Sequence, residues 1–165
     1  MRAPDLNPCI GNNFIDANVL DRTGGPEDTA VDTILRLCGE SAFRLLLPYS
    51  VKAEVEHPNT PAEVKRKATQ LIFSMPVNLI GPEATELEKI HALIQGNAKP
   101  GQHHRDAFHL FESAKYGGRH FITNDRRLLQ KAPEIWASLQ IKVLKPSDFL
   151  AAYLKHAKHA RNRPL

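Results

Sequence analysis

The sequence predicts an α/β fold in which a central, mostly parallel sheet of about five strands is flanked by helices. Three observations predict it. Short apolar runs alternate along the chain with segments of helical spacing, as in parallel strands joined by crossover helices. Residues 43–47 are apolar almost throughout, as expected of a strand buried on both faces. The 165 residues suffice for one domain with a single core.

The N-terminal part of the chain is predicted to contain two strands separated by a helix. The apolar pair Phe14-Ile15 ends the first strand. A helix is expected over residues 26–39, because Pro26 favours a first helical position and Gly39 favours a helix end. Residues 43–47 form the second strand.

The middle of the chain is predicted to be mainly helical. A short helix carrying Glu54 is expected to start at Ser50, a favourable N-cap. It ends at His57-Pro58, because the residue before a proline resists the helical conformation. The elements expected next are a helix, a weak third strand, a helix and a polar loop, at residues 61–72, 77–80, 82–95 and 95–102.

The C-terminal third is predicted to alternate again between helix and strand. The expected elements are a helix from Asp106 to Gly117-Gly118, a strand at 119–123, a short helix around 128–129, a strand at 141–144 and a helix capped by Ser147. One domain is therefore expected from residue 10 to residue 154.

A basic tail, residues 155–165, is expected to follow this domain and to be flexible. It carries the cations Lys155, Lys158 and Arg161 and no acid. Two interpretations stay open. The tail is a solvated, frayed C-terminus, or it is an arm that binds RNA phosphates with an affinity that falls as salt rises.

Composition restricts the location of the protein and its general chemistry. The net charge of +4 fits a phosphate-rich partner without requiring one. No apolar run approaches the ~20 residues needed to cross a bilayer, and the first residues lack the apolar core of a signal peptide. We therefore expect no membrane partner and a cytoplasmic location. Cys9 and Cys38 lack a paired short spacing and are expected to be free thiols.

Four acidic residues occupy positions that such a fold brings together. Asp16 and Asp125 each follow an apolar run, Glu54 comes a few residues after the second strand, and Asp106 heads a helix. In open parallel sheets the binding site lies beyond the carboxyl ends of the strands. At least three of the four acids are therefore predicted to lie along one edge of the sheet.

This set of acids predicts metal-assisted phosphodiester hydrolysis. Carboxylates that converge on one cleft repel one another unless a cation joins them. Oxygen ligands, with no Cys or His at zinc spacing, favour Mg²⁺ or Mn²⁺, bound as one or two ions. Such ions bind phosphate oxygens, activate water and stabilise the leaving oxygen of a phosphodiester.

Polar neighbours are expected to support the acids. Asn18 is suited to hold a water or to orient a phosphate. The residues expected to hydrogen-bond to the carboxylates are Ser50, Thr123 and Asn124. Arg126-Arg127 follows Asp125 directly and is interpreted either as a charged surface turn or as a pair of RNA-binding side chains that contact phosphate.

Each acid taken alone has a simpler interpretation. An aspartate at a strand end is often a turn residue or a helix cap. Glu56 competes with Glu54, but the two face differently on a helix, and Glu54 lies between the apolar residues Val51 and Val55. The other acids available near the first strand are Asp21, Asp28 and Asp32. The pair His103-His104 is interpreted as solvent-facing residues at a helix start.

Taken together, these motifs resemble those of the PIN-domain ribonucleases, and most closely the single-domain toxins of VapC type. The resemblance extends from about Phe14 to about Phe149. It rests on four segments in order, residues 14–20, 50–55, 106–107 and 122–125. The segment around Glu54 is the least specific of the four.

The resemblance implies a PIN-like three-layer sandwich and Mg²⁺- or Mn²⁺-dependent cleavage of single-stranded RNA. The catalytic, metal-site residues implied by position are Asp16, Glu54, Asp106 and Asp125, with Asn18 and Thr123 beside them. It also implies a homodimer held inactive by a small antitoxin protein. The chain departs from the compact toxins in its residues before Phe14, its basic tail and its long segment between Glu54 and Asp106. A stand-alone RNA-processing enzyme is therefore also open.

Three other classes of protein are alternatives to a nuclease. The main alternative is a PIN-like module that binds RNA or a protein without cleavage, although such a module has no need for a costly cluster of acids. A receiver domain requires adjacent acids after its first strand, where Asp16 stands alone. A phosphatase of haloacid-dehalogenase type requires a second aspartate where this chain has Asn18.

Overall fold

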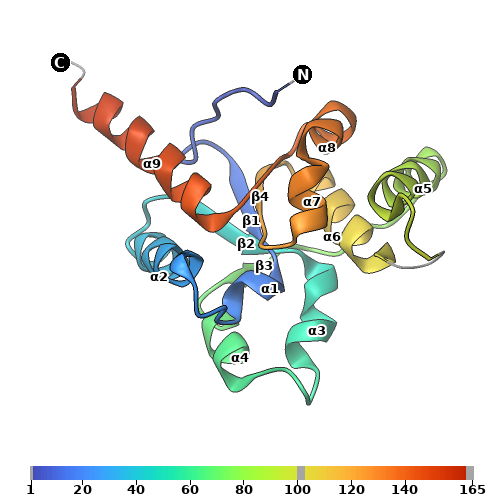
Figure 1. Cartoon of the computed structure of the whole chain (residues 1–165), viewed down its shortest axis with the longest axis horizontal. Coiled ribbons are helices and arrows are strands. Elements are labelled where there is room, and N and C mark those ends of the chain that lie inside the picture. The colour runs from blue at the N-terminus through green and yellow to red at the C-terminus, as the bar shows by residue number, and fades with distance from the viewer. Residues whose placement is uncertain (1, 100–102, 163–165) are drawn as a thin grey trace.

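The central feature of the structure, a computed structural model, is a five-stranded parallel sheet with the strand order β3-β2-β1-β4-β5. The structure describes residues 2–99 and 103–162. The strands are β1 (Asn12–Ile15), β2 (Arg44–Leu47), β3 (Ile72–Phe73), β4 (Gly118–Ile122) and β5 (Lys142–Leu144). Helices cover both faces of the sheet (Figure 1). The predicted α/β three-layer arrangement is confirmed.

Two hydrophobic layers form because successive strand residues point to opposite faces of the sheet. Ile15 and Ile122 belong to one buried cluster, and their neighbours Phe14 and Phe121 belong to the other. Helices of the first layer are α1 (Ala17–Leu20), α2 (Pro26–Gly39), α3 (Lys52–Glu56), α4 (Ala62–Ala68) and α9 (Pro146–Arg161). Helices of the second are α5 (Pro82–Gln95), α6 (His104–Lys115), α7 (Arg126–Gln130) and α8 (Ala132–Leu139).

The strand order places the carboxyl ends of β1 and β4 side by side. From β1 the chain builds β2 and β3 on one side, then returns to form β4 and β5 on the other side. Ile15 pairs with Ile122, so the residues that follow, Asp16 and Thr123, are neighbours across the sheet. The point where the order of parallel strands reverses is where such folds bind ligands.

The third strand lies earlier in the chain than the sequence predicted. β3 consists of Ile72 and Phe73, which pair with Leu46 and Leu47, whereas residues 77–80 have no regular structure. Helix α4 correspondingly ends at Ala68 instead of continuing to residue 72. Pairing with the edge of β2 therefore overrides the helical spacing of the apolar residues in this segment.

Two serines expected to be N-caps have other partners. Ser50 lies inside a 3-10 turn, η1 (Tyr49–Val51), and its hydroxyl bonds to His109. Ser147 lies inside α9, and both its N–H and its hydroxyl donate to the Glu27 carboxylate at 2.8 Å. Glu27 on α2 therefore accepts a hydrogen bond from a backbone N–H in the first turn of α9, which has no partner within that helix.

Two helical segments were not predicted, namely α8 in the second layer and the C-terminal part of α9 in the first layer. Helix α8 follows α7 after a single residue and was not predicted, although it buries Ile135 and Trp136. Residues 155–161, expected to be a flexible tail, continue α9 as a regular helix. Residues 163–165 of that tail, and residues 100–102 of the predicted polar loop, lie outside the described residues.

Two expectations from composition can be compared with the structure. Cys9 and Cys38 are free thiols, with Cys9 exposed and Cys38 half-buried. Among residues 2–99 and 103–162, no helix combines the length and the apolar character that crossing a membrane requires.

A buried polar pair joins β1 to β4 below the carboxyl edge. The Asn13 amide donates to the carbonyls of Pro8 and Arg44 at 2.9 and 2.8 Å, so its oxygen faces His120 Nδ1 at 2.7 Å. His120 must therefore carry its proton on Nδ1. Its Nε2 is buried without a hydrogen-bond partner among the described residues. Burial lowers the pKa of His120 to about 4, so the ring is neutral at physiological pH.

Gly118, at the start of β4, allows the close approach of helix α6 to the sheet. A Cβ there would lie 2.6 Å from the Ser113 carbonyl oxygen and 2.8 Å from a Phe14 ring carbon. We expect Gly118→Ala to lower the free energy of unfolding by about 1–3 kcal/mol, because buried backbone and ring atoms would have to move. Urea denaturation measures the change. Gly39→Ala, where no atom lies within 4 Å, is the matched control and is expected to be neutral or slightly stabilising.

His120 predicts a loss of stability in acid. Its pKa is about 4 when folded and 6.5 in an unfolded chain, so the unfolded state takes up the proton first as pH falls. The stabilisation is complete above pH 6.5 and is lost progressively towards pH 4. We expect this group to remove on the order of 2 kcal/mol of unfolding free energy between pH 7.5 and pH 4.5. Urea denaturation at both pH values should show a smaller difference for His120→Gln; an equal difference would contradict the assignment.

A candidate acidic site at the carboxyl edge of the sheet

Asp16 is the buried centre of the candidate site. It follows β1 directly and precedes α1, with a side chain that makes no helix-cap bond. Only 5% of the residue is exposed. Its N–H donates to the Ile122 carbonyl at 2.9 Å, and its Oδ2 accepts from the Thr123 hydroxyl at 3.1 Å. One hydrogen bond thus fixes the backbone of Asp16 to β4, and the other fixes its carboxylate.

The Thr123 hydroxyl connects three polar residues at this edge. It donates its single proton to Asp16 and accepts from Asn18 Nδ2 at 3.3 Å and from the Asp125 N–H at 3.1 Å. The Asn124 N–H contacts Asn18 Oδ1 at 3.4 Å. Of the residues expected to hydrogen-bond to these carboxylates, Thr123 does so directly, Asn124 contacts Asn18, and the Ser50 hydroxyl contacts His109.

Asp125 acts as the N-cap of α7. Its Oδ1 accepts from the N–H groups of Arg127 and Leu128 at 2.8 and 3.3 Å. The simpler interpretation of this acid, a helix cap, is therefore correct for one of its oxygens. It is joined to Asp16 only through Thr123 in the contacts of the described residues.

Glu54 reaches the site through a histidine that sequence reasoning missed. Its Oε1 lies 3.0 Å from His109 Nε2, and His109 Nδ1 lies 2.7 Å from the Ser50 hydroxyl. The competitor Glu56 lies on the exposed side of α3, with 64% of its side chain accessible. His109 is three residues after Asp106, a spacing that places both on one face of a helix. That spacing was the available signal.

Asp106 lies in the first turn of α6, where its Oδ2 contacts His103 Nδ1 at 3.0 Å. Its side chain is 28% exposed. His103 is therefore bonded to an acid instead of facing solvent alone. The negative charge of Asp106 acts on both Asp16 and His109, which places it electrostatically within the same site.

The pKa values show that these groups form one charge network. Burial raises the pKa of Asp16 to about 6, opposed by His109 and reinforced by the charges of Asp106 and Glu54. The hydrogen bond from His109 lowers the pKa of Glu54. Burial works against protonation of His109, but its bond to Glu54 and the charges of Asp16 and Asp106 raise its pKa. The three acids thus favour the protonated form of His109, whose positive charge would offset part of their mutual repulsion.

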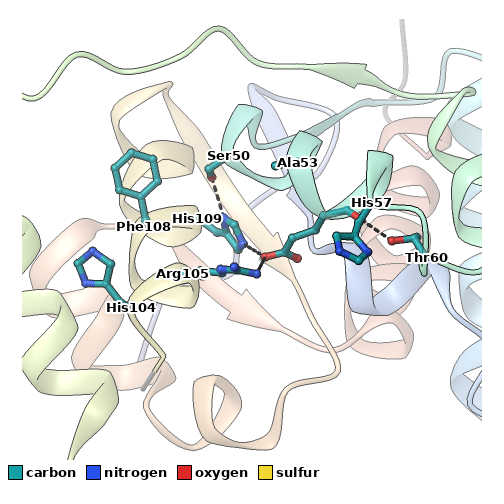
Figure 2. Close-up of a pocket in the computed structure, with 9 residues that line it drawn as sticks. Ser50, Ala53, His57, Thr60, His104, Arg105, Phe108 and His109 are labelled. Carbon is teal, nitrogen blue, oxygen red and sulfur yellow. Dashed lines mark hydrogen bonds and ion pairs between the residues drawn. The ribbon is translucent and has the colours of Figure 1, made fainter. Parts of the chain in front are cut away.

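A cleft of about 790 Å³ adjoins this network between α3 and α6. Glu54, His109 and Ser50 line it, so the cleft and the acidic site share residues. Figure 2 shows Arg105 beside His109 and the dashed contact between Ser50 and His109. Arg105 lies 3.9 Å from Glu54 and exposes 81% of its side chain.

The basic residues predicted to bind RNA have different positions. Arg126 is exposed, whereas Arg127 donates to the Gln95 carbonyl at 3.0 Å and so ties α7 to the end of α5. Lys155 on α9 forms an ion pair with Asp5. The other two cations of the former tail are exposed on the last turns of α9, at Lys158 and Arg161.

The basic end of α9 lies away from the acidic site. Lys142, the first residue of β5, donates to the Pro4 carbonyl at 3.1 Å, and the adjacent residue Asp5 pairs with Lys155. Lys155 is therefore near the amino ends of the strands, opposite to the edge that carries Asp16. In Figure 1, the end of α9 projects from the side of the molecule remote from α3 and α6.

The chemistry of these donors fits Mg²⁺ or Mn²⁺. Asp16, Asp106 and Glu54 offer hard oxygen ligands whose mutual repulsion a divalent cation would relieve. Among residues 2–99 and 103–162, no three His, Cys, Asp or Glu side chains lie close enough together to form a group that could hold a metal ion. Asp16 and Asp106 would hold the ion, and Glu54 would join them on release from His109.

Asp16 predicts an unusual gain of stability on neutralisation. Its folded pKa, about 6, exceeds the unfolded value of 3.8, so the destabilisation that the Asp16 charge causes is absent below pH 3.8 and is fully present once pH has risen through 6. In EDTA at pH 8, we expect Asp16→Asn to raise the free energy of unfolding by on the order of 2 kcal/mol, with no gain below pH 4. Urea denaturation at both pH values measures it. If the variant were less stable than wild type at pH 8, the negative charge of Asp16 would not be destabilising the folded protein.

Comparison of the chain with protein-family models, curated proteins and solved structures gives no match. Function is therefore argued from the fold and from the site itself.

Proposed function

We propose that this protein is a Mg²⁺- or Mn²⁺-dependent endoribonuclease that hydrolyses phosphodiester bonds of single-stranded RNA. One observation carries the proposal. Three carboxylates from separate segments, Asp16 after β1, Glu54 on α3 and Asp106 on α6, interact at the carboxyl edge of the sheet, and Asp16 is almost fully buried there. A fold pays for such a cluster in stability, which is typical of sites kept for function.

Each residue has a defined part in this proposal. When bound, the divalent ion supplies charge neutralisation at the phosphate and activation of water. Thr123 fixes the Asp16 carboxylate through its 3.1 Å hydrogen bond to Oδ2, and Asp16 would hold the ion in that orientation. Asn18 positions the Thr123 hydroxyl and offers an amide to substrate. His109 holds Glu54 at the cleft.

The resemblance to VapC-type toxins suggests a cellular role and protein partners for this nuclease. It supports a cytoplasmic nuclease that is the toxin of a type II toxin–antitoxin pair, forms a homodimer and is inhibited by a small antitoxin protein. A stand-alone RNA-processing enzyme would use the same site.

Two observations favour a second candidate, a PIN-like module that binds RNA or protein without cleavage. Asp125 already uses one oxygen to cap α7, and Glu54 is already paired with His109. If both contacts persist when metal is supplied, Asp16 and Asp106 would have to hold the ion without Glu54. RNA binding without cleavage under any divalent ion would support this candidate.

A cleavage assay tests the nuclease proposal. We expect purified protein with Mg²⁺ or Mn²⁺ to cut an RNA that contains single-stranded loops, and EDTA to stop it. Asp16→Asn and Asp106→Asn are each expected to slow cleavage by more than about 100-fold, because loss of even a supporting partner of a metal site typically costs 10–100-fold.

The matched control for this assay is Asp32→Asn. Asp32 is an exposed acid on α2, 3.8 Å from Arg22 and outside the charge network. It should cleave at the wild-type rate. Full cleavage activity in Asp16→Asn would show that the reaction does not use this site.

A further inference from the structure

The α3–α6 cleft contains cationic and aromatic side chains that the acidic site does not explain. Arg105, Phe108 and His109 line it from α6, and Glu54 and His57 line it from the α3 side. Residues three and four positions apart on a helix share a face, so Arg105, Phe108 and His109 point to the same side of α6. Figure 2 shows Phe108 and His104 at one end of the cleft, Arg105 in the middle, and His57 and Thr60 at the other end.

The Arg105 guanidinium is available to a ligand. Its contact with Glu54, at 3.9 Å, is too long for a hydrogen bond, and 81% of the side chain is exposed. Arginine presents several N–H donors in a plane that matches the oxygens of a phosphate. Glu54 meanwhile has a closer partner in His109, at 3.0 Å. The arginine can therefore turn to an anion without leaving the carboxylate unpaired.

His57 offers a second donor on the opposite wall. Its Nδ1 accepts a hydrogen bond from the Asn59 N–H at 3.1 Å, which leaves Nε2 to carry the proton of the neutral ring. The ring is exposed in the cleft. The backbone around it is held by Thr60, whose hydroxyl donates to the Glu54 carbonyl.

Phe108 supplies the aromatic component. It is half-buried and packs at the margin of the second hydrophobic cluster, while it also lines the cleft. Proteins that bind single-stranded nucleic acids combine such aromatic faces, on which bases stack, with cations that contact the backbone. The cleft volume of about 790 Å³ lies within the range of about 300–1,000 Å³ that is common for small-ligand sites.

We propose that the α3–α6 cleft is a subsite for one nucleotide of single-stranded RNA, with the base against Phe108 and the phosphate at Arg105. Because Glu54 and His109 belong to both the cleft and the acidic site, this nucleotide neighbours the bond that is cut. That last placement rests on the proposed nuclease function. The subsite makes the affinity for RNA depend on Phe108 and Arg105, which are not among the carboxylates of the acidic site.

The test measures the affinity of a short fluorescent single-stranded RNA by anisotropy, in an Asp16→Asn background that prevents cleavage. Phe108→Leu keeps an apolar side chain, although a smaller one, and removes the ring, and it is expected to weaken binding about tenfold with an unchanged salt dependence. Arg105→Ala should also weaken binding and should reduce the slope of log K against log salt by about 0.7, the loss of one phosphate contact on a single strand. Phe108→Trp should retain the affinity.

Two controls separate the subsite from general effects. Arg36→Ala removes an exposed arginine on α2, paired with Glu40 at 2.9 Å, and should change neither affinity nor salt slope. Polyphosphate, which has no bases, should lose affinity with Arg105→Ala but not with Phe108→Leu. Thermal denaturation of each variant establishes that it is folded.

The outcomes distinguish the subsite from the nuclease. If Phe108→Leu and Arg105→Ala bind RNA as the background does while wild type cleaves it, the subsite is overturned and the nuclease stands. If both variants weaken binding but wild type never cleaves, the subsite stands and the nuclease falls. If the folded background protein does not bind RNA, the subsite is overturned, and cleavage by the wild type alone decides the nuclease.

Discussion

The pairing of β1 with β4 is the constraint on which the candidate site depends. These strands are separated by about a hundred residues of sequence, yet Ile15 lies opposite Ile122 in the register of the sheet. Asp16 and Thr123 become neighbours only through that register. Below them, the buried Asn13 and His120 join the same two strands by side chains. A shift of the register by one residue would turn every one of these side chains to the other face.

Charge balance is the second constraint, and it explains why the site has a histidine. A buried aspartate close to two further carboxylates is costly in the absence of a cation. The pKa of His109 is raised in the same place by these acids, and its two ring nitrogens link Ser50 of η1 to Glu54 of α3. Glu112, one turn further along α6, is buried and accepts from the Ser50 N–H at 2.7 Å. Helix α6 therefore anchors the segment that presents Glu54.

The elements that depend on local sequence signals were predictable. The elements whose formation depends on contacts with residues distant in the sequence were less so. Helix α2 has its predicted bounds because Pro26 and Gly39 mark its ends. β3 was misplaced because two residues form a strand only when the edge of β2 is there to pair with them. Asp16 and Asp125 were located correctly at strand ends by a rule of parallel sheets. The contacts of His109 and the cap role of Asp125 depend on side-chain geometry, which residue order alone does not specify.

The cap formed by Asp125 has a consequence for conformational entropy. Its Oδ1 is tied to two backbone N–H groups of α7, so the side-chain torsions are set before any ligand arrives. A free aspartate must give up rotamer freedom when it takes on a ligand, and that loss opposes binding. For Asp125 the loss has already occurred during folding. Its second oxygen is therefore preorganised, and rigid α7, more than the mobility of the side chain, determines where that oxygen points.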